Sequence, residues 1–201
     1  MAEILFGIDL GGTKIEGVVM ENAAKPIVLA RHRIPTEQTK GYSHIIQQIK
    51  ALLTHLENES GIKATKIGIG TPGVTNPKTG LLKNSNTQCL NNQPLQADLT
   101  QALWIPANLA NDANCFALAE AIWGAGASLP NPPQVVFGVI MGTGVGGGLV
   151  VNGKVWNGGH GIAGEWGHNP LQHDGPDCYC GKNGCVEKVI SGPALEQYYH
   201  K

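Results

Sequence analysis

Charged residues are scarce in this sequence of 201 residues: Asp, Glu, Lys and Arg together make up 14%, and the formal net charge is −1. An average globular domain carries roughly 25% of these residues. The sequence has no basic run and no acidic tail, so a nucleic acid is not expected as its main partner. It also lacks an apolar run of the roughly 18 residues that a membrane span needs. Its first residues, MAEILFGIDLGGTK, lack the basic start of a signal peptide.

These absences predict a cytoplasmic protein without a membrane partner. Cysteine is limited to five residues, and in a reducing compartment metal ligation or core packing explains them better than disulfides do. Glycine, in contrast, is abundant: 28 residues, gathered in clusters. The hydrophobic share of 42% is enough for a buried core.

The hydrophobic pattern predicts an α/β fold with mixed sheets in two lobes. In the first half we expect strands over 4–8, 14–20, 27–34, 66–70 and 105–109 and helices over 42–59, 95–103 and 111–123. A strand at 135–141, a glycine-rich turn and a returning strand over 149–156 then repeat the order of the beginning, and a last helix is expected over 191–200. The stretches 74–94 and 124–133 are typical of loops. The first lobe is therefore placed at 1–123 and an incomplete second lobe at 124–201.

Two glycine-rich turns lie between apolar strands, at 9–14 (DLGGTK) and 142–148 (GTGVGGG). Glycine lets backbone N–H groups approach phosphate oxygens closely, so both turns are candidate phosphate loops. Asp9 stands beside the first turn, where it can hold Mg²⁺ directly or through water. Two ordinary hairpins are the alternative, with Asp9 as a simple turn residue. The GxGxxG of the second turn precedes a strand rather than a helix, which excludes a dinucleotide fingerprint.

Asn111 and Asp112 follow a predicted strand and open a predicted helix. Phosphoryl transfer to an alcohol needs a positioned acceptor for the hydroxyl proton, and Asp112 is a candidate for that base. The competing interpretation is an ordinary helix N-cap.

A cluster of metal-binding residue types lies between 165 and 187. His168, Cys178, Cys180 and Cys185 make the donor set of a closed, structural zinc site. Glu165 and Glu187 flank these ligands and could accept hydrogen bonds from sugar hydroxyls. His160 and His173 are rival histidine ligands, and the alternative for the whole cluster is free core cysteines with solvated glutamates.

Six segments together resemble the ROK family of sugar kinases and repressors, in the actin/hexokinase-like superfamily: GIDLGGTK (7–14), GIGTPG (68–73), NDANCFALAEA (111–121), GTGVGGG (142–148), GEWGH (164–168) and CYCGKNGCVE (178–187). The resemblance implies two actin/ribonuclease-H-like lobes with a cleft between them. It also implies ATP with Mg²⁺, a structural Zn²⁺ and a hexose acceptor.

The resemblance further implies roles for individual residues. Asp112 would be the catalytic base, and the sugar contacts would be Gly73, Asn86, Asn111, Glu165, His168 and Glu187. The nucleotide side would use Asp9, Gly11, Gly12, Thr13, Lys14, Gly142, Thr143 and Gly144. His168 would serve zinc with one ring nitrogen and the sugar with the other, beside the zinc ligands Cys178, Cys180 and Cys185.

The segments 82–95 and 164–171 look most like the bacterial fructokinase and mannokinase branch, so fructose or mannose, phosphorylated at the 6-hydroxyl, is the expected acceptor. A kinase of N-acetylglucosamine, N-acetylmannosamine or glucose is the alternative within the family. The family's kinases are longer than this chain, so we expect the C-terminal third with the adenine site to be missing. That length motivates an alternative of another class, an inactive sugar-binding remnant. The repressor branch is disfavoured because the first strand begins near residue 4, and a homodimer is expected.

Overall fold

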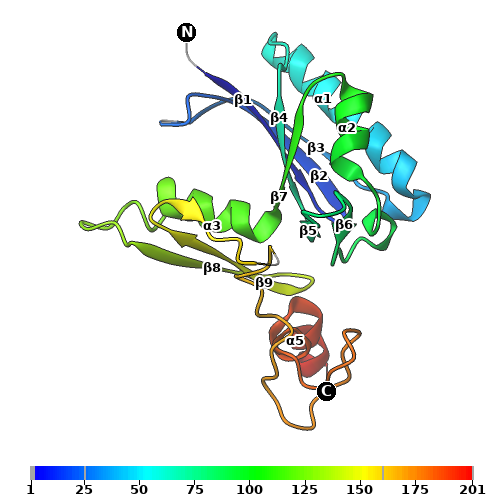
Figure 1. The fold of residues 1–201 in the computed structure, drawn as a ribbon, viewed down its shortest axis with the longest axis vertical. Coiled ribbons are helices and arrows are strands. Elements are labelled where there is room, and N and C mark those ends of the chain that lie inside the picture. The colour runs from blue at the N-terminus through cyan, green and yellow to red at the C-terminus, as the bar shows by residue number, and fades with distance from the viewer. Residues whose placement is uncertain (1–2, 25, 160, 201) are drawn as a thin grey trace. The chain divides into compact units, whose positions relative to one another are not determined.

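The computed structural model describes residues 3–24, 26–159 and 161–200, and its contacts separate two compact units between Asp112 and Ala113 (Figure 1). This boundary differs from the one after residue 123 that the sequence pattern predicts. The reason is helix α3 (Asp112–Ile122), which packs on the sheet of the second unit. A methyl group added at Gly138 of that sheet would lie 2.7 Å from the Cβ of Ala117 in α3.

Unit 1 is built on a five-stranded mixed sheet in the order β3-β2-β1-β4-β7. The strands are β1 (Ile4–Leu10), β2 (Lys14–Glu21), β3 (Ile27–Pro35), β4 (Ile67–Thr71) and β7 (Ala107–Asn111). β1, β2 and β3 form an antiparallel meander, whereas β4 and β7 run parallel to β1. The carboxyl ends of β1, β4 and β7 therefore meet at one edge of the sheet.

Helices α1 (Tyr42–Ser60) and α2 (Leu95–Leu103) pack on this unit and complete its core. The helical spacing of Ile45, Ile49, Leu52 and Leu56 places all four on one buried face. Gly61 ends α1 in the left-handed conformation with φ 70°, where glycine is unstrained. The five strands expected in the first half of the chain are thereby confirmed, as are the helices expected over 42–59 and 95–103.

The predicted loop 74–94 contains short regular segments: β5 (Val74–Thr75), β6 (Leu82–Lys83) and the 3-10 turn Gln88–Leu90. A further 3-10 turn, Gln38–Lys40, precedes α1. These pieces are too short to give a periodic signal in the sequence.

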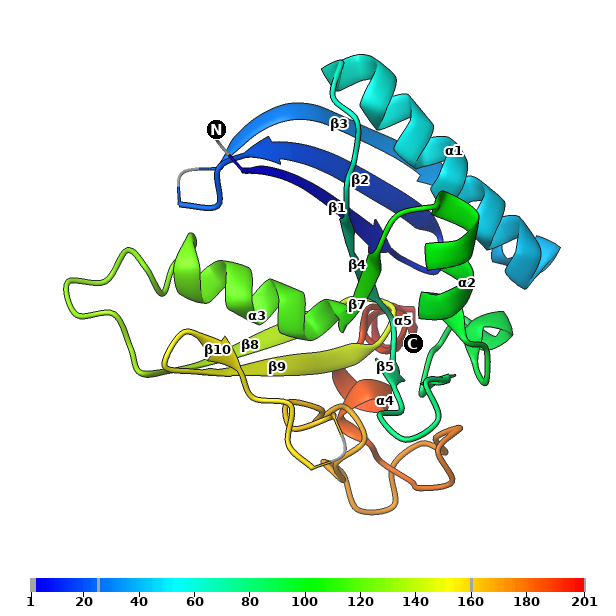
Figure 2. The ribbon, with the colours of Figure 1, turned by 45° about the horizontal axis from the view of Figure 1, so that its top comes forward.

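Unit 2 contains the antiparallel sheet β10-β9-β8, formed by β8 (Val135–Met141), β9 (Val145–Val151) and β10 (Lys154–Val155). Figure 2 shows α3 lying along β8 and β9. The strand predicted over 149–156 is two strands, because β9 begins inside the glycine run and Asn152-Gly153 form a turn with φ values of 50° and 72°. Helices α4 (Val186–Ile190) and α5 (Gly192–Tyr199) follow, of which only α5 was predicted.

None of the helices in the described part of the chain combines the length and apolar character that a bilayer crossing requires.

Candidate active site and metal cluster

The first glycine-rich turn closes the β1–β2 hairpin. The Gly11 amide donates to the Lys14 carbonyl at 3.0 Å, so it is engaged inside the turn. Thr36 holds the turn from the side: its hydroxyl donates to the Gly11 carbonyl at 2.6 Å and its amide donates to the Thr13 carbonyl at 3.0 Å. A fixed, glycine-lined backbone of this kind is suited to binding an anion through the remaining amides.

Asp9 lies opposite Glu16 in the β1–β2 register. Displacement of water by the surrounding protein, together with the like charge of Glu16, raises the pKa of Asp9, and Lys14 opposes this effect. Glu16 itself accepts from Arg31 Nε at 2.5 Å and from Arg33 Nε at 2.6 Å. A cation beside Asp9 would remove the electrostatic cost of its charge, which is consistent with the predicted Mg²⁺ role. Glu16 was not predicted from the sequence, although its position opposite Asp9 in the expected hairpin was an available signal.

The carboxyl edge of the parallel strands gathers further predicted residues. The register places Asp9 level with Gly70 of β4, and Gly70 level with Ala110 of β7. Asn111 is 8% exposed, and its side-chain amide donates to the Gly73 carbonyl at 3.1 Å. Asp112 follows it, half-buried. The structure therefore brings these predicted residues of unit 1 to one edge of its sheet.

Gly73 and Asn86 belong to the loop segments beside this edge. Gly73 has φ 85°, and an added methyl group there would collide with the Lys83 carbonyl, so glycine is required. Asn86 is exposed. The adjacent Thr87 is buried, and its hydroxyl finds no hydrogen-bond partner among the described residues. Thr87 lies against the first turn, with its hydroxyl oxygen 3.4 Å from a methyl group placed at Gly12, and no local pattern in the sequence points to it.

The second glycine-rich turn is supported by the C-terminal helices of unit 2. The Gly142 amide donates to the Gly144 carbonyl at 2.9 Å, and the Gly192 amide of α5 donates to the Gly142 carbonyl at 2.8 Å. Glu187 of α4 accepts a hydrogen bond from the Val145 amide at 3.0 Å. A methyl group at Gly144 would lie only 2.6 Å from the same carboxylate oxygen. One oxygen of Glu187, predicted as a sugar contact, is thus engaged with the turn.

The segment GEWGH lies directly on β9. A methyl group at Gly164 would come within 2.5 Å of the Gly147 carbonyl, and one at Gly167 would collide with the Val145 carbonyl. The indole of Trp166 donates to the Gly146 carbonyl at 2.9 Å. This close approach of two backbones, possible only with glycine, fixes the positions of Glu165 and His168. Glu165 is exposed and His168 is half-buried.

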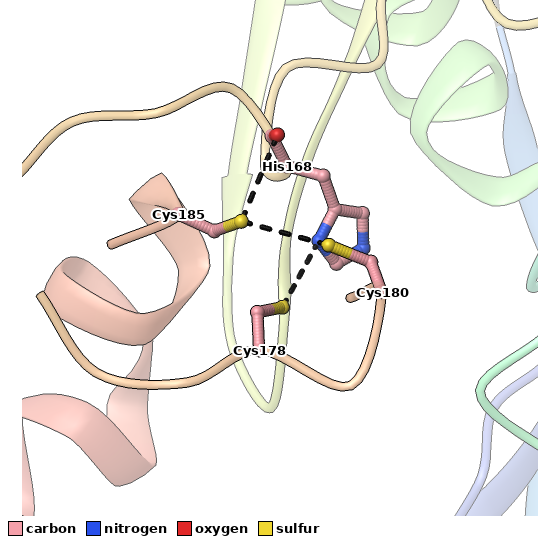
Figure 3. Close-up of side chains that lie close together, drawn as sticks. All are labelled: His168, Cys178, Cys180 and Cys185. Carbon is pink, nitrogen blue, oxygen red and sulfur yellow. Dashed lines mark hydrogen bonds between the residues drawn. The ribbon is translucent and has the colours of Figure 1, made fainter. Parts of the chain in front are cut away.

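The predicted metal ligands converge in space. One ligand atom from each of His168, Cys178, Cys180 and Cys185 lies within 4.8 Å of the others (Figure 3). His168 Nδ1 is 3.5 Å from Cys178 Sγ, and Cys180 Sγ is 3.6 Å from Cys185 Sγ. Tetrahedral zinc, with bonds of about 2.0–2.3 Å, holds its ligand atoms about 3.3–3.8 Å apart. These donors therefore fit zinc in both type and spacing.

Of the two rival histidines, His173 does not join this cluster. His173 is 95% exposed and contacts Asp174, and His160 lies outside the described residues. Burial and the neighbouring sulfurs raise the pKa of Cys185 to about 11, whereas a hydrogen bond from the Lys182 backbone is the main cause that lowers the pKa of Cys180. Zinc would favour the thiolate forms of the cysteines, because only deprotonated sulfur ligates the metal.

Tyr179 is a functional candidate that the sequence analysis missed. Its hydroxyl lies 3.1 Å from His168 Nε2, the ring nitrogen directed away from the cysteines, and the two rings meet edge to face at 5.1 Å. Loss of solvent around the phenol, followed by the charge and hydrogen bond of Glu187, raises the pKa of Tyr179 to about 12. Tyr179 thus connects His168 with Glu187. Its place between two cysteines of the cluster was the available signal.

Comparisons with known proteins agree with this set of motifs. An N-acetyl-D-glucosamine kinase of Aliivibrio salmonicida (strain LFI1238) is 40% identical over 205 residues, covering 96% of this chain and 65% of that protein. The chain thus spans just under two thirds of that relative's length. The solved structures that resemble this chain include a hexokinase and a glucokinase. A ROK hexokinase from Thermus thermophilus has a TM-score of 0.78 and 33% identity, over 98% of this chain and 63% of that one. A ROK family glucokinase from Streptomyces griseus, in complex with glucose and AMPPNP, has a TM-score of 0.81 and 30% identity, over 98% of this chain and 60% of that one. The sequence model of the ROK family matches residues 5–201, so this chain belongs to the ROK family.

Proposed function

We propose that this chain carries the acceptor-binding and phosphate-binding machinery of an ATP-dependent hexose kinase. The observation that supports this most is the edge of unit 1, where Asp9, Asn111 and Asp112 gather at the carboxyl ends of parallel strands. A carboxylate for a cation and a carboxylate for a hydroxyl proton are what phosphoryl transfer to an alcohol requires. The glucokinase relative, whose structure contains glucose and AMPPNP, supports the same assignment.

We propose N-acetylglucosamine as the acceptor, in place of the fructose or mannose that the segments 82–95 and 164–171 suggest. The reason for this revision is the N-acetyl-D-glucosamine kinase from Aliivibrio salmonicida, at 40% identity. Glucose is the second candidate, because a ROK glucokinase is among the similar structures. Hexoses differ at only a few hydroxyl and amide positions, so the identity of the acceptor depends on a few contacts.

In this proposal Asp112 accepts the proton of the acceptor hydroxyl. The freed oxygen forms a bond to the γ-phosphorus, the bond to the bridging oxygen breaks, and ADP leaves with the electron pair. Asn111 is held by its hydrogen bond to Gly73, which makes it a rigid neighbour of the base. Bound Mg-ATP supplies the phosphoryl group and its charge neutralisation. Gly11, Gly12, Thr13 and Lys14 of unit 1 and Gly142, Thr143 and Gly144 of unit 2 are assigned to hold phosphate.

The acceptor contacts are assigned to Gly73, Asn86 and Asn111 in unit 1 and to Glu165, His168 and Glu187 in unit 2. Zinc is assigned to His168 and the three cysteines, where four protein ligands leave no open coordination position. Its role is structural, because it joins three segments of a loop-rich region that contains little regular structure.

The experiment is a coupled ADP-release assay with Mg-ATP, run on this chain and on the longest product of its gene. The panel contains N-acetylglucosamine, N-acetylmannosamine, glucose, fructose and mannose. We expect sugar-dependent release that is fastest with N-acetylglucosamine and falls by about a hundredfold or more in Asp112→Asn. Asp174→Asn is the matched control, because Asp174 is 89% exposed and its φ of 58° suits asparagine.

Each of the other outcomes refutes one part of the proposal. No release from either form, with sugar binding retained, would refute the kinase and leave the sugar-binding remnant. Fastest release with fructose would refute the revised acceptor. Equal activity in Asp112→Asn would refute Asp112 as the base.

A further inference from the structure

A second group of metal-ligand side chains lies in unit 1, far along the chain from the cysteine cluster. It consists of His32 on β3 and of His55 and Glu59 on α1, with one ligand atom from each within 4.8 Å of the others. The two imidazole rings are stacked, with centroids 3.7 Å apart and planes inclined by 26°. His55 Nε2 is 3.6 Å from Glu59 Oε2. None of the six segments that resemble the ROK family contains these three residues.

The packing of α1 on the sheet brings the three side chains together. His32 lies beside Gly17 in the β2–β3 register. Because Gly17 has no side chain, α1 approaches β2 closely, and a methyl group there would lie 2.5 Å from Leu56 Cδ1. Buried Leu52 and Leu56 fix the rotation of the helix, which sets His55 above His32. Glu59 follows His55 by four residues and so shares its helix face.

The three donors have the chemistry of a transition-metal site. Imidazole nitrogen suits Zn²⁺, Ni²⁺ and Cu²⁺, whereas Mg²⁺ and Ca²⁺ prefer oxygen ligands throughout. A bound ion would need ligand atoms about 3.3 Å apart, from bonds of about 2.0–2.1 Å. In the stacked pair the in-plane nitrogen lone pairs lie side by side rather than pointing at one ion, so His55 must turn out of the stack to bind. The His55 and Glu59 side chains are 49% and 44% exposed, so both can move without disturbing the core. Three protein ligands would leave at least one coordination position for water.

We infer that His32, His55 and Glu59 form a second divalent transition-metal site, specific for ions that favour imidazole, which ties β3 to α1. The inference depends on neither the kinase activity nor the cysteine cluster. An ion there would link two elements that are otherwise joined by side-chain packing, so it stabilises unit 1 against unfolding.

The test uses protein without a polyhistidine tag, loaded beforehand with one equivalent of Zn²⁺. Zn²⁺ is then titrated by calorimetry, with imidazole ¹⁵N shifts of His32 and His55 as a second readout. We expect the wild type to bind one further equivalent and to shift both imidazoles. His55→Gln combined with Glu59→Gln should lose that equivalent and keep the first.

His44→Gln is the matched control. His44 is on the same helix and also pairs with one carboxylate, that of Glu37 at 2.8 Å, but it belongs to neither cluster found among the described residues. This variant should retain the second equivalent. His32→Gln, which lies on β3, should abolish binding of the second equivalent. It provides an independent test if the variants on α1 fold poorly. If no zinc equivalent bound by the wild type shifts the His32 and His55 imidazoles, or if that equivalent persists in folded His32→Gln, the inference is overturned.

Discussion

Two measurements on Glu187→Ala separate two roles of one side chain. The carboxylate is proposed to contact sugar, and it also accepts the Val145 amide at 3.0 Å, where the second glycine-rich turn becomes β9. Val145 is 6% exposed, so its amide has little access to water once the acceptor is gone. The alanine variant therefore leaves a buried donor unpaired.

The expected loss of stability follows from that geometry. A buried donor left without a partner costs about 1–3 kcal/mol. Glutamine keeps an acceptor oxygen but not the charge, and neutral hydrogen bonds contribute roughly 1 kcal/mol less than charged ones. We expect Glu187→Ala to destabilise unit 2 by about 1–3 kcal/mol and Glu187→Gln by about 1 kcal/mol.

The assay is amide hydrogen exchange at Val145 together with urea denaturation, and Glu196→Ala on the exposed face of α5 is the control. Exchange at Val145 should accelerate in Glu187→Ala, much less in Glu187→Gln, and not in the control, while zinc content stays constant because Glu187 is not a ligand. If Glu187→Ala raised the KM for sugar without changing exchange at Val145, its support of the turn would be refuted.

Three further predictions concern other parts of the molecule. Gly17→Ala should lower stability by about 1–3 kcal/mol, because the new methyl group meets Leu56 at 2.5 Å, and an unchanged melting temperature would contradict this packing. Tyr179→Phe removes the hydroxyl 3.1 Å from His168 Nε2 and should weaken zinc binding about tenfold in a chelator competition, whereas unchanged affinity would show that this contact does not orient the ligand. Partial burial would raise the pKa of Glu16, but hydrogen bonds from Arg33 and Arg31 hold it below the usual 4.5. The stabilisation from these pairs is therefore fully present above the unfolded pKa and is lost as pH falls through the folded pKa. Glu16→Gln should therefore cost at most about 1 kcal/mol at pH 7 and flatten the acid limb of the stability curve, and an acid limb identical to that of the wild type would refute the effect.

Much of the fold was predictable because the relevant signals are local. Alternating or continuous apolar runs identified β1, β2, β3 and β8, and the spacing of Ile45, Ile49, Leu52 and Leu56 identified α1. The donor set of the metal cluster was equally local, since three of its four members lie within eight residues of one another. The zinc ion itself remains a prediction.

Other features depended on how distant segments pack. The helix α3 joins unit 2 because Gly138 and Gly148 admit it onto the sheet, a fit that hydrophobic periodicity does not encode. The proposed acceptor changed from fructose or mannose to N-acetylglucosamine only on comparison with relatives, because a few hydroxyl contacts, not a motif, distinguish one hexose from another.

By itself the sequence determined the longer strands and helices, the family motifs and the chemical types available at each site, because these depend on neighbouring residues. Only the tertiary structure decided which oxygen of Glu187 meets Val145, which nitrogen of His168 meets Tyr179, and that His32 lies under His55. Such contacts join residues far apart in the chain, and they are fixed by strand register and by the closeness with which glycine lets backbones approach.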